Sequence, residues 1–87
     1  MSQGRPTPPL PRADIVVDAI GLPCPGPILR LALAVKGAQV GEIIEVVGTD
    51  PGILADAPAW AIMTGHAIIG AYSDDGRHRF WFRKAHD

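Results

Sequence analysis

Hydrophobic and polar positions follow two different periods along this chain. Apolar residues recur at helical spacing in one segment, at Ile28, Leu31, Ala32 and Val35. This stripe predicts an amphipathic helix from Pro25 to Lys36, because proline suits the first helical position and a glycine directly after Lys36 favours termination. Four other runs are rich in β-branched or aromatic residues and predict strands. They are Ile15–Val17, Glu42–Val47, Ala67–Tyr72 and Arg77–Arg83.

The segment between the second and third strands contains opposing signals. Thr49-Asp50-Pro51 is typical of a helix start, with Asp50 as the N-cap. Pro58, however, disfavours helical backbone at the residue before it. We therefore expect a turn near Asp56, with that aspartate as a turn residue, and a helix only from Pro58 to Thr64.

The resulting order of elements is β-α-β-α-β-β, and Asp75-Gly76 is a strong signal for a hairpin between the last two strands. The expected fold class is α+β, a two-layer α/β sandwich in which two helices cover one face of a four-stranded mixed sheet. Residues 1–12 are rich in proline and poor in apolar residues, which predicts a flexible N-terminal tail. Residues 13–85 form the single domain.

Composition excludes several classes of function. The 87 residues carry a net charge of −1, so no basic surface of the kind that binds nucleic acid directly is expected. One cysteine and three scattered histidines fit neither a disulfide scaffold nor a metal site, and we expect no cofactor. No apolar run is long enough to cross a membrane, and the N-terminus does not resemble a secretory signal. We expect a cytoplasmic protein.

The segment Cys24-Pro25-Gly26-Pro27 is the candidate reactive site. Cys24 falls at the expected N-cap of the first helix, where the dipole contributes ~0.3–1 kcal/mol to an anion and lowers a thiol pKa by less than about one unit. The prolines would hold the loop rigid and present the sulfur outward. The competing interpretation is a small buried hydrophobic side chain, which is the usual environment of a lone cysteine. A catalytic cysteine needs an oriented base, whereas a group carrier can take its acid–base chemistry from partners.

The last strand carries candidate residues for docking a partner protein. They are Arg79, Trp81, Arg83 and Lys84. Trp81 shares the strand parity of the two arginines, which places it on their side of the sheet and opposite the neighbouring phenylalanines. An exposed tryptophan beside cations would be a contact anchor. The alternative is an ordinary solvated surface.

The sequence around Cys24 resembles the signature of the TusA family of sulfur carriers, also called SirA-like proteins, which place Cys-Pro-x-Pro at the start of the first helix. The resemblance extends over Ile15 to Ala85. Its segments are Asp18 to Pro27, Val40-Gly41-Glu42, Thr49-Asp50-Pro51, Asp56 with Pro58 and Trp60, Gly65-His66, and Phe82-Arg83-Lys84.

This resemblance implies that Cys24 accepts a sulfane sulfur as a persulfide from a cysteine desulfurase or a rhodanese. It would then pass the sulfur to an acceptor protein for tRNA thiolation, cofactor sulfuration or sulfur oxidation. The family often has glutamate between the two prolines, where this chain has Gly26. Two alternatives stay open: a regulatory or redox-sensing interaction module with an incidental thiol, and RNA binding by the basic hairpin alone.

Overall fold

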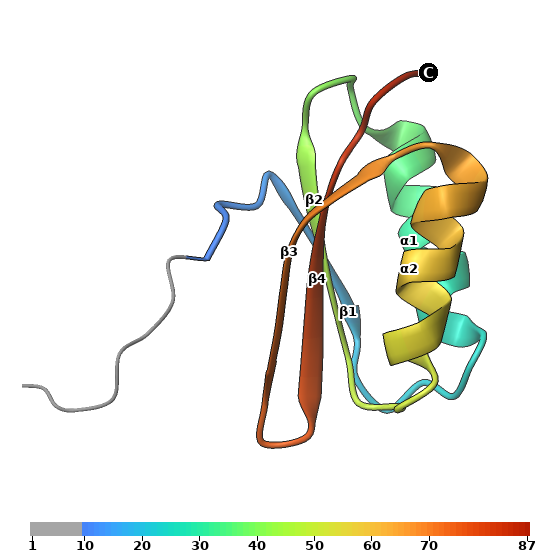
Figure 1. Cartoon of the computed structure of the whole chain (residues 1–87), viewed down its shortest axis with the longest axis vertical. Coiled ribbons are helices and arrows are strands. Elements are labelled where there is room, and N and C mark those ends of the chain that lie inside the picture. The colour runs from blue at the N-terminus through green and yellow to red at the C-terminus, as the bar shows by residue number, and fades with distance from the viewer. Residues whose placement is uncertain (1–9) are drawn as a thin grey trace, which may run out of the picture.

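The computed structural model describes residues 10–87, which form a four-stranded sheet with two helices packed on one face (Figure 1). The predicted flexible tail falls largely on residues outside this range. The elements are β1 (Ile15–Ala19), α1 (Gly26–Gly37), β2 (Ile43–Gly48), α2 (Ile53–Thr64), β3 (Ala67–Asp74) and β4 (Arg77–Arg83). No helix within the described range is long and apolar enough to cross a membrane.

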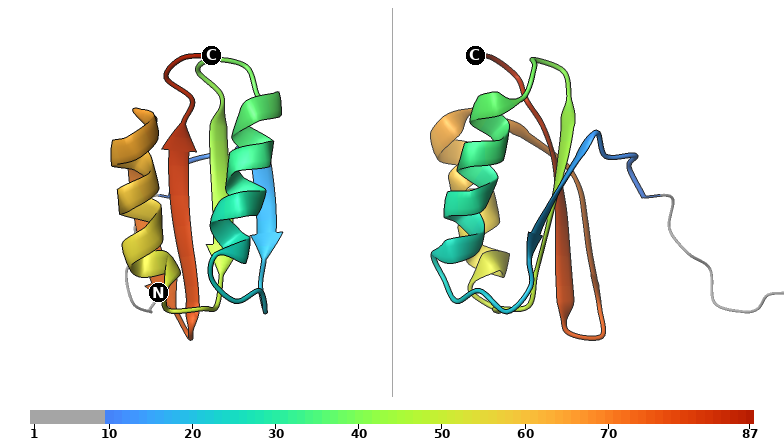
Figure 2. Two further views of the ribbon diagram at one scale, coloured as in Figure 1. Left: turned by 90° about the vertical axis from the view of Figure 1, so that its right-hand side faces the viewer. Right: turned by 180° about the vertical axis from the view of Figure 1, so that it is seen from behind.

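The sheet is mixed, and its strands lie in the order β1-β2-β4-β3. β1 and β2 are parallel, whereas β4 runs antiparallel to both β2 and β3. The two helices lie side by side over the sheet, and both begin at the end of the molecule where β1 and β2 terminate (Figure 2). The loops that precede the two helices therefore lie close together. This architecture confirms the predicted fold class.

The hydrophobic core lies between the sheet and the helices. From β4 it takes Phe80 and Phe82, and α1 contributes Leu31 and Val35 from the predicted apolar stripe. Burying side chains of this size contributes about 1.5–3 kcal/mol each, which is the main energy that holds the helical layer on the sheet. Other buried members are Val17, Ala19, Ala38, Ile44, Val46, Ile53 and Ala57.

The second helix is longer than the sequence predicts. α2 begins at Ile53, five residues before the expected start, and Pro58 lies inside it. Pro58 cannot donate the hydrogen bond that a helix would direct to the carbonyl of Leu54, which favours a break. Ile53 and Ala57, however, are one helical turn apart and both are fully buried in the core. Packing on this face therefore outweighs the backbone preference of the proline.

Candidate functional site

Cys24 lies in the loop between β1 and α1, and its side chain is exposed to solvent. The helix begins at Gly26 with Pro25 as the N-cap, so Cys24 precedes the cap by one residue instead of occupying it. Pro27 is fully buried and fixes the loop to the domain, while the Gly26 N–H donates to the Pro23 carbonyl at 2.7 Å. The thiol is therefore presented on a short, anchored turn, and the interpretation as a buried hydrophobic side chain is wrong.

Asp50 joins the Cys24 loop to the start of α2. Its Oδ2 accepts a hydrogen bond from the Cys24 N–H at 3.0 Å, and its Oδ1 accepts one from the Gly52 N–H at 2.7 Å. The bond from Gly52, followed by the bond from Cys24, lowers the pKa of the Asp50 carboxyl below its usual range. The prediction of Asp50 as the N-cap of the second helix is wrong, because Gly52 is the N-cap of α2; Asp50 instead joins the turn before α2 to the backbone of Cys24.

Asp56 is the side-chain partner of the thiol. The Cys24 Sγ–H donates to Asp56 Oδ2 with Sγ and Oδ2 2.5 Å apart. This hydrogen bond raises the pKa of the Cys24 thiol above its ordinary value, and desolvation and the negative charges of Asp56 and Asp50 add to the effect. The expectation of a lowered pKa is wrong because the Asp56 hydrogen bond favours the protonated thiol and the charges of Asp56 and Asp50 oppose the thiolate. The sequence predicted Asp56 to be a turn residue, because the second helix was expected to start only at Pro58.

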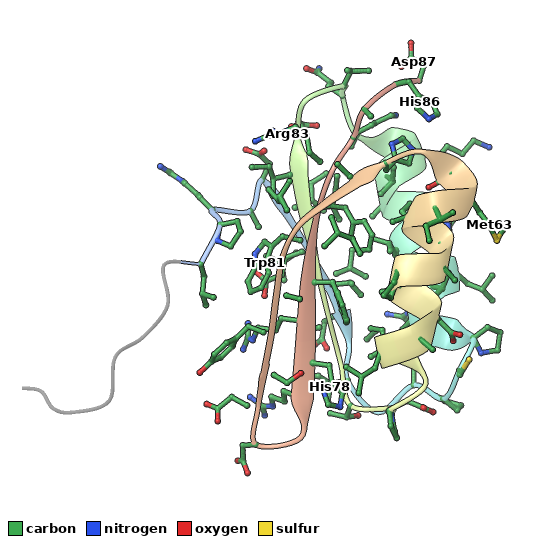
Figure 3. The ribbon with its side chains drawn as sticks, viewed as in Figure 1. Met63, His78, Trp81, Arg83, His86 and Asp87 are labelled. Carbon is green, nitrogen blue, oxygen red and sulfur yellow. The ribbon has the colours of Figure 1, made fainter. Side chains whose placement is uncertain are left out.

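An open groove of about 260 Å³ lies beside the thiol, between α1 and α2. Cys24 and Asp56 share its wall with apolar side chains from both helices. These are Pro25, Ile28, Ala59, Trp60 and Met63. Met63 is 80% exposed and points away from the sheet (Figure 3). A reacting group that enters the groove would therefore meet a sulfur and a carboxylate within a largely apolar surface.

The four predicted docking residues do not form one exposed surface. Arg83 is exposed, and Arg79 forms an ion pair with Glu45, with its Nη1 at 2.7 Å from Glu45 Oε2. Trp81 is only 1% exposed, so the prediction of an exposed anchor is wrong. Its parity is as predicted, since it lies on the side of the sheet opposite the helices, but the segment before β1 packs there (Figure 3). A side chain on Gly70 would contact both Pro11 and Trp81, which shows how closely these groups approach.

Lys84 is also buried, and it stabilises the end of α1. It is 5% exposed, and its Nζ donates to the carbonyl of Ala38 at 2.7 Å and to that of Lys36 at 3.4 Å. A cation at these carbonyls satisfies acceptors that a helix end leaves free and complements the dipole. Lys84 is therefore unavailable for the predicted contact with a partner.

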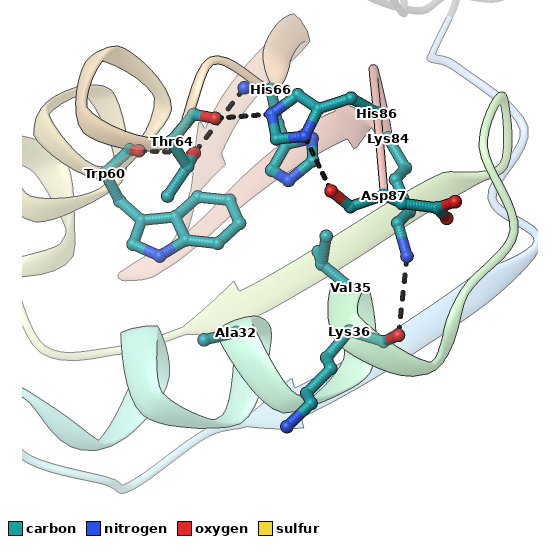
Figure 4. Close-up of a pocket in the computed structure, with 9 residues that line it drawn as sticks. All are labelled: Ala32, Val35, Lys36, Trp60, Thr64, His66, Lys84, His86 and Asp87. Carbon is teal, nitrogen blue, oxygen red and sulfur yellow. Dashed lines mark hydrogen bonds between the residues drawn. The ribbon is translucent and has the colours of Figure 1, made fainter.

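A second groove, of about 360 Å³, lies at the far ends of the helices (Figure 4). His86 Nε2 donates to the Thr64 carbonyl at 2.7 Å and Nδ1 to the Asp87 carbonyl at 2.9 Å, with both donors present in the imidazolium. These bonds raise the pKa of His86. His66 stacks on this ring and its Nδ1 accepts from the Ala85 N–H, while burial lowers its pKa. Lys84 and His86 thus bond to carbonyls at the ends of α1 and α2, a role that could not be seen in the sequence.

Within residues 10–87, no three His, Cys, Asp or Glu side chains are grouped as metal ligands. The histidines also lie away from the thiol. His66 and His86 line the second groove, and His78 Nδ1 is 2.8 Å from Ser73 Oγ on the β3–β4 hairpin. The site thus combines an exposed thiol with a carboxylate, and does not contain the Cys–His pair of a cysteine hydrolase.

A small α+β domain that presents one thiol from a proline-bounded loop resembles known sulfur-handling proteins in sequence and in fold. A family model described as sulfurtransferase TusA matches residues 15–84. The chain belongs to the TusA family.

Individual relatives agree with this assignment. The sulfur carrier protein TusA of Pseudomonas entomophila is 34% identical over 74 residues, which cover 85% of this chain and 92% of the relative. YrkF of Bacillus subtilis, a candidate sulfur carrier protein by its description, is 41% identical over 73 residues. That match covers 84% of this chain but 40% of YrkF, so this chain spans about two fifths of the length of that relative.

A solved structure shows the same fold. The SirA-like protein from Desulfitobacterium hafniense superposes with a TM-score of 0.71 and covers 83% of this chain and 99% of its own length. Its sequence identity is 20%, so the likeness concerns the arrangement of helices and strands.

Proposed function

We propose that this protein is a sulfur carrier in which Cys24 holds the transferred sulfur as a persulfide. The observation that carries the proposal is an exposed, free thiol on an anchored proline loop, in a chain of the TusA family. Cys24 is the only cysteine in the sequence, so it would perform both the loading and the unloading step. The proposed location is the cytoplasm, where thiols are kept reduced.

Loading requires a donor protein with a sulfane sulfur, such as a cysteine desulfurase or a rhodanese. The Cys24 sulfur attacks the terminal sulfur of the donor persulfide, and the donor thiolate leaves. Unloading repeats this exchange with the thiol of an acceptor protein. A direct nucleic acid contact is not needed, because the acceptor would carry the sulfur onward to tRNA thiolation, cofactor sulfuration or sulfur oxidation.

The geometry of the site supports an exchange between proteins. The thiol lies at one end of the helical layer and opens to solvent, and the adjoining groove is lined by α1 and α2. Transpersulfidation requires the attacking, transferred and leaving sulfurs to lie in line, which an exposed turn permits and a deep pocket would obstruct. Proteins that bind at this end would contact exposed apolar side chains near the starts of the helices, Leu29 and Leu54, and Met63 in the adjoining groove.

The test is a loading assay with intact-mass detection. Incubation of the reduced protein with a desulfurase and cysteine, or with a rhodanese and thiosulfate, should add about 32 Da that dithiothreitol removes. Cys24→Ser is the matched control, because it keeps the size of the side chain and removes the thiol. If wild type gains no sulfur from either system, or if the serine variant gains the same mass, Cys24 is not a sulfur carrier.

A further inference from the structure

The Asp56 carboxylate contacts the Cys24 sulfur and is held by a rigid element. Asp56 lies in the first turn of α2, where its N–H donates to the Gly52 carbonyl at 3.0 Å. The next residue, Ala57, is fully buried in the core. The 2.5 Å hydrogen bond from Cys24 Sγ to Asp56 Oδ2 therefore joins two anchored segments, which are 32 residues apart in the sequence. A base must lie within hydrogen-bond reach of the proton it removes, and Asp56 does.

The resting sulfur is a thiol at neutral pH. The Asp56 hydrogen bond, desolvation and the charges of Asp56 and Asp50 all raise the thiol pKa. Since a thiolate attacks sulfur and a thiol does not, the proton must leave Cys24 as the new bond forms. The acceptor for that proton is Asp56 Oδ2, with which the thiol already forms a hydrogen bond.

We infer that Asp56 is a catalytic residue of sulfur transfer, which takes the Cys24 thiol proton during attack and delivers it to the leaving sulfur. This inference rests on the proposed function of Cys24 as a sulfur carrier. Both groups line the same open groove, so a donor sulfur placed against Cys24 would also lie near Asp56.

The step balances without a further reactant. A bond forms between Cys24 Sγ and the terminal sulfur of the donor persulfide, while the bond between the two donor sulfurs breaks and leaves its electron pair on the donor cysteine. The proton moves from Sγ to Asp56 Oδ2 and then to that departing thiolate. The products are a Cys24 persulfide, a donor thiol and an ionised Asp56. No net oxidation or reduction occurs, and unloading to an acceptor thiol is the same step in reverse.

The experiment compares two reactions of the same sulfur in Asp56→Asn. Iodoacetamide measures thiolate reactivity alone, and glutathione persulfide supplies a transferable sulfur with a thiolate leaving group. Removal of the Asp56 charge should lower the thiol pKa. Each unit of that decrease should speed alkylation at pH 7 roughly threefold, because a roughly tenfold rise in thiolate is partly offset by weaker nucleophilicity. Sulfur transfer should slow by roughly 10² or more, the contribution typical of a positioned base.

Two further variants separate this role from a structural one. Asp75→Asn removes the same charge on the β3–β4 hairpin, outside the groups that act on the thiol, and should leave both rates at wild-type values. Asp56→Glu retains a carboxylate and should recover transfer in part. The wild-type transfer rate should stay nearly constant between about pH 6 and 8. The transfer rate of Asp56→Asn should instead rise with pH over this range, because it depends on the ionised fraction of the thiol.

The outcomes distinguish the alternatives. If alkylation and transfer both become faster in Asp56→Asn, the carboxylate only suppresses the thiolate, and the proposal is overturned. It is also overturned if neither rate changes. Asp56→Ser provides a second neutral variant if asparagine disturbs folding, which circular dichroism would detect. Failure of wild type to accept sulfur, or mass gain by Cys24→Ser, would refute the carrier function itself and is a separate result.

Discussion

Substitution of Lys84 by methionine should destabilise the domain, although the sequence suggested a surface role for this lysine. Its ammonium group donates to the Ala38 and Lys36 carbonyls at the end of α1, and the side chain is 5% exposed. Methionine has a similar length and can fill the same space, but it cannot donate a hydrogen bond. The variant thus removes the interaction with little change in packed volume.

The magnitude follows from the bonds that are lost. A hydrogen bond from a charged donor contributes about 1.5–3 kcal/mol, and a cation at a helix C-terminus adds about 0.3–1 kcal/mol. Burying the ammonium has its own cost, which methionine avoids and which offsets part of the loss. We expect the free energy of unfolding to fall by about 2 kcal/mol, or roughly 8–16 °C in Tm for a domain of this size.

Urea unfolding followed by tryptophan fluorescence measures this loss directly. The matched control is Lys36→Met, because the Lys36 side chain is exposed and its removal should cost less than about 0.5 kcal/mol. A Lys84→Met variant within about 0.5 kcal/mol of wild type would refute the reasoning, since the desolvation of the ammonium would then cancel its hydrogen bonds.

Three further predictions concern other elements of the fold. The folded pKa of His86 is raised, so its stabilising contribution is fully present below the unfolded pKa of 6.5 and is lost as pH rises through the folded value. His86→Ala should therefore lower the urea midpoint more at pH 5.5 than at pH 8.5. Pro58→Ala restores a helical hydrogen-bond donor within α2 and should raise the free energy of unfolding by about 1 kcal/mol, as read from its urea midpoint. Gly70→Ala places a Cβ 2.9 Å from Pro11 Cγ, which should displace that segment and speed hydrogen exchange of the Trp81 indole, measured by NMR.

Each of these predictions has an outcome that contradicts it. An equal loss at both pH values would show that His86 acts without its charge. A lower urea midpoint for Pro58→Ala would mean that the rigidity of the proline in the unfolded chain outweighs the missing bond. Unchanged hydrogen exchange of the Trp81 indole in Gly70→Ala would show that the segment around Pro11 adjusts to the methyl group without uncovering Trp81. Gly37→Ala is the matched control, since a Cβ at Gly37 meets nothing within 4 Å.

Periodicity was sufficient for much of the fold, because most elements are amphipathic in a regular way. The stripe from Ile28 to Val35 matches α1, and the Asp75-Gly76 turn lies between β3 and β4, with Asp75 at a φ of 53°. The predicted start of α2 was wrong because the local backbone preference at Pro58 disfavours a helix there, whereas burial of Ile53 and Ala57 favours one. That burial depends on packing against the sheet, which the local sequence does not show.

The chemistry of the site was harder to predict than its location. Cys24 was identified from its prolines, but the sign of its pKa shift depends on Asp56, which becomes a neighbour only once α2 is continuous. The error in the predicted start of α2 therefore led to the wrong sign for the predicted pKa shift of Cys24. Trp81 and Lys84 show the same limit, since strand parity gives the face of a residue but not what covers it.

The residues that react and the residues that stabilise the helix ends lie at opposite ends of the helical layer. Cys24 and Asp56 meet near the start of α2, whereas Lys84 and His86 cap the far ends of the helices. Charges that are screened by solvent and lie at opposite ends of a helix interact weakly. Effects at the two sites should therefore add independently. The loading rate of Lys84→Met per folded molecule should equal that of wild type, and the change in free energy of unfolding in the Lys84→Met/Asp56→Asn double variant should equal the sum of the two single changes. A Lys84→Met protein that is folded but loads sulfur slowly would show that the two ends are coupled through the helices.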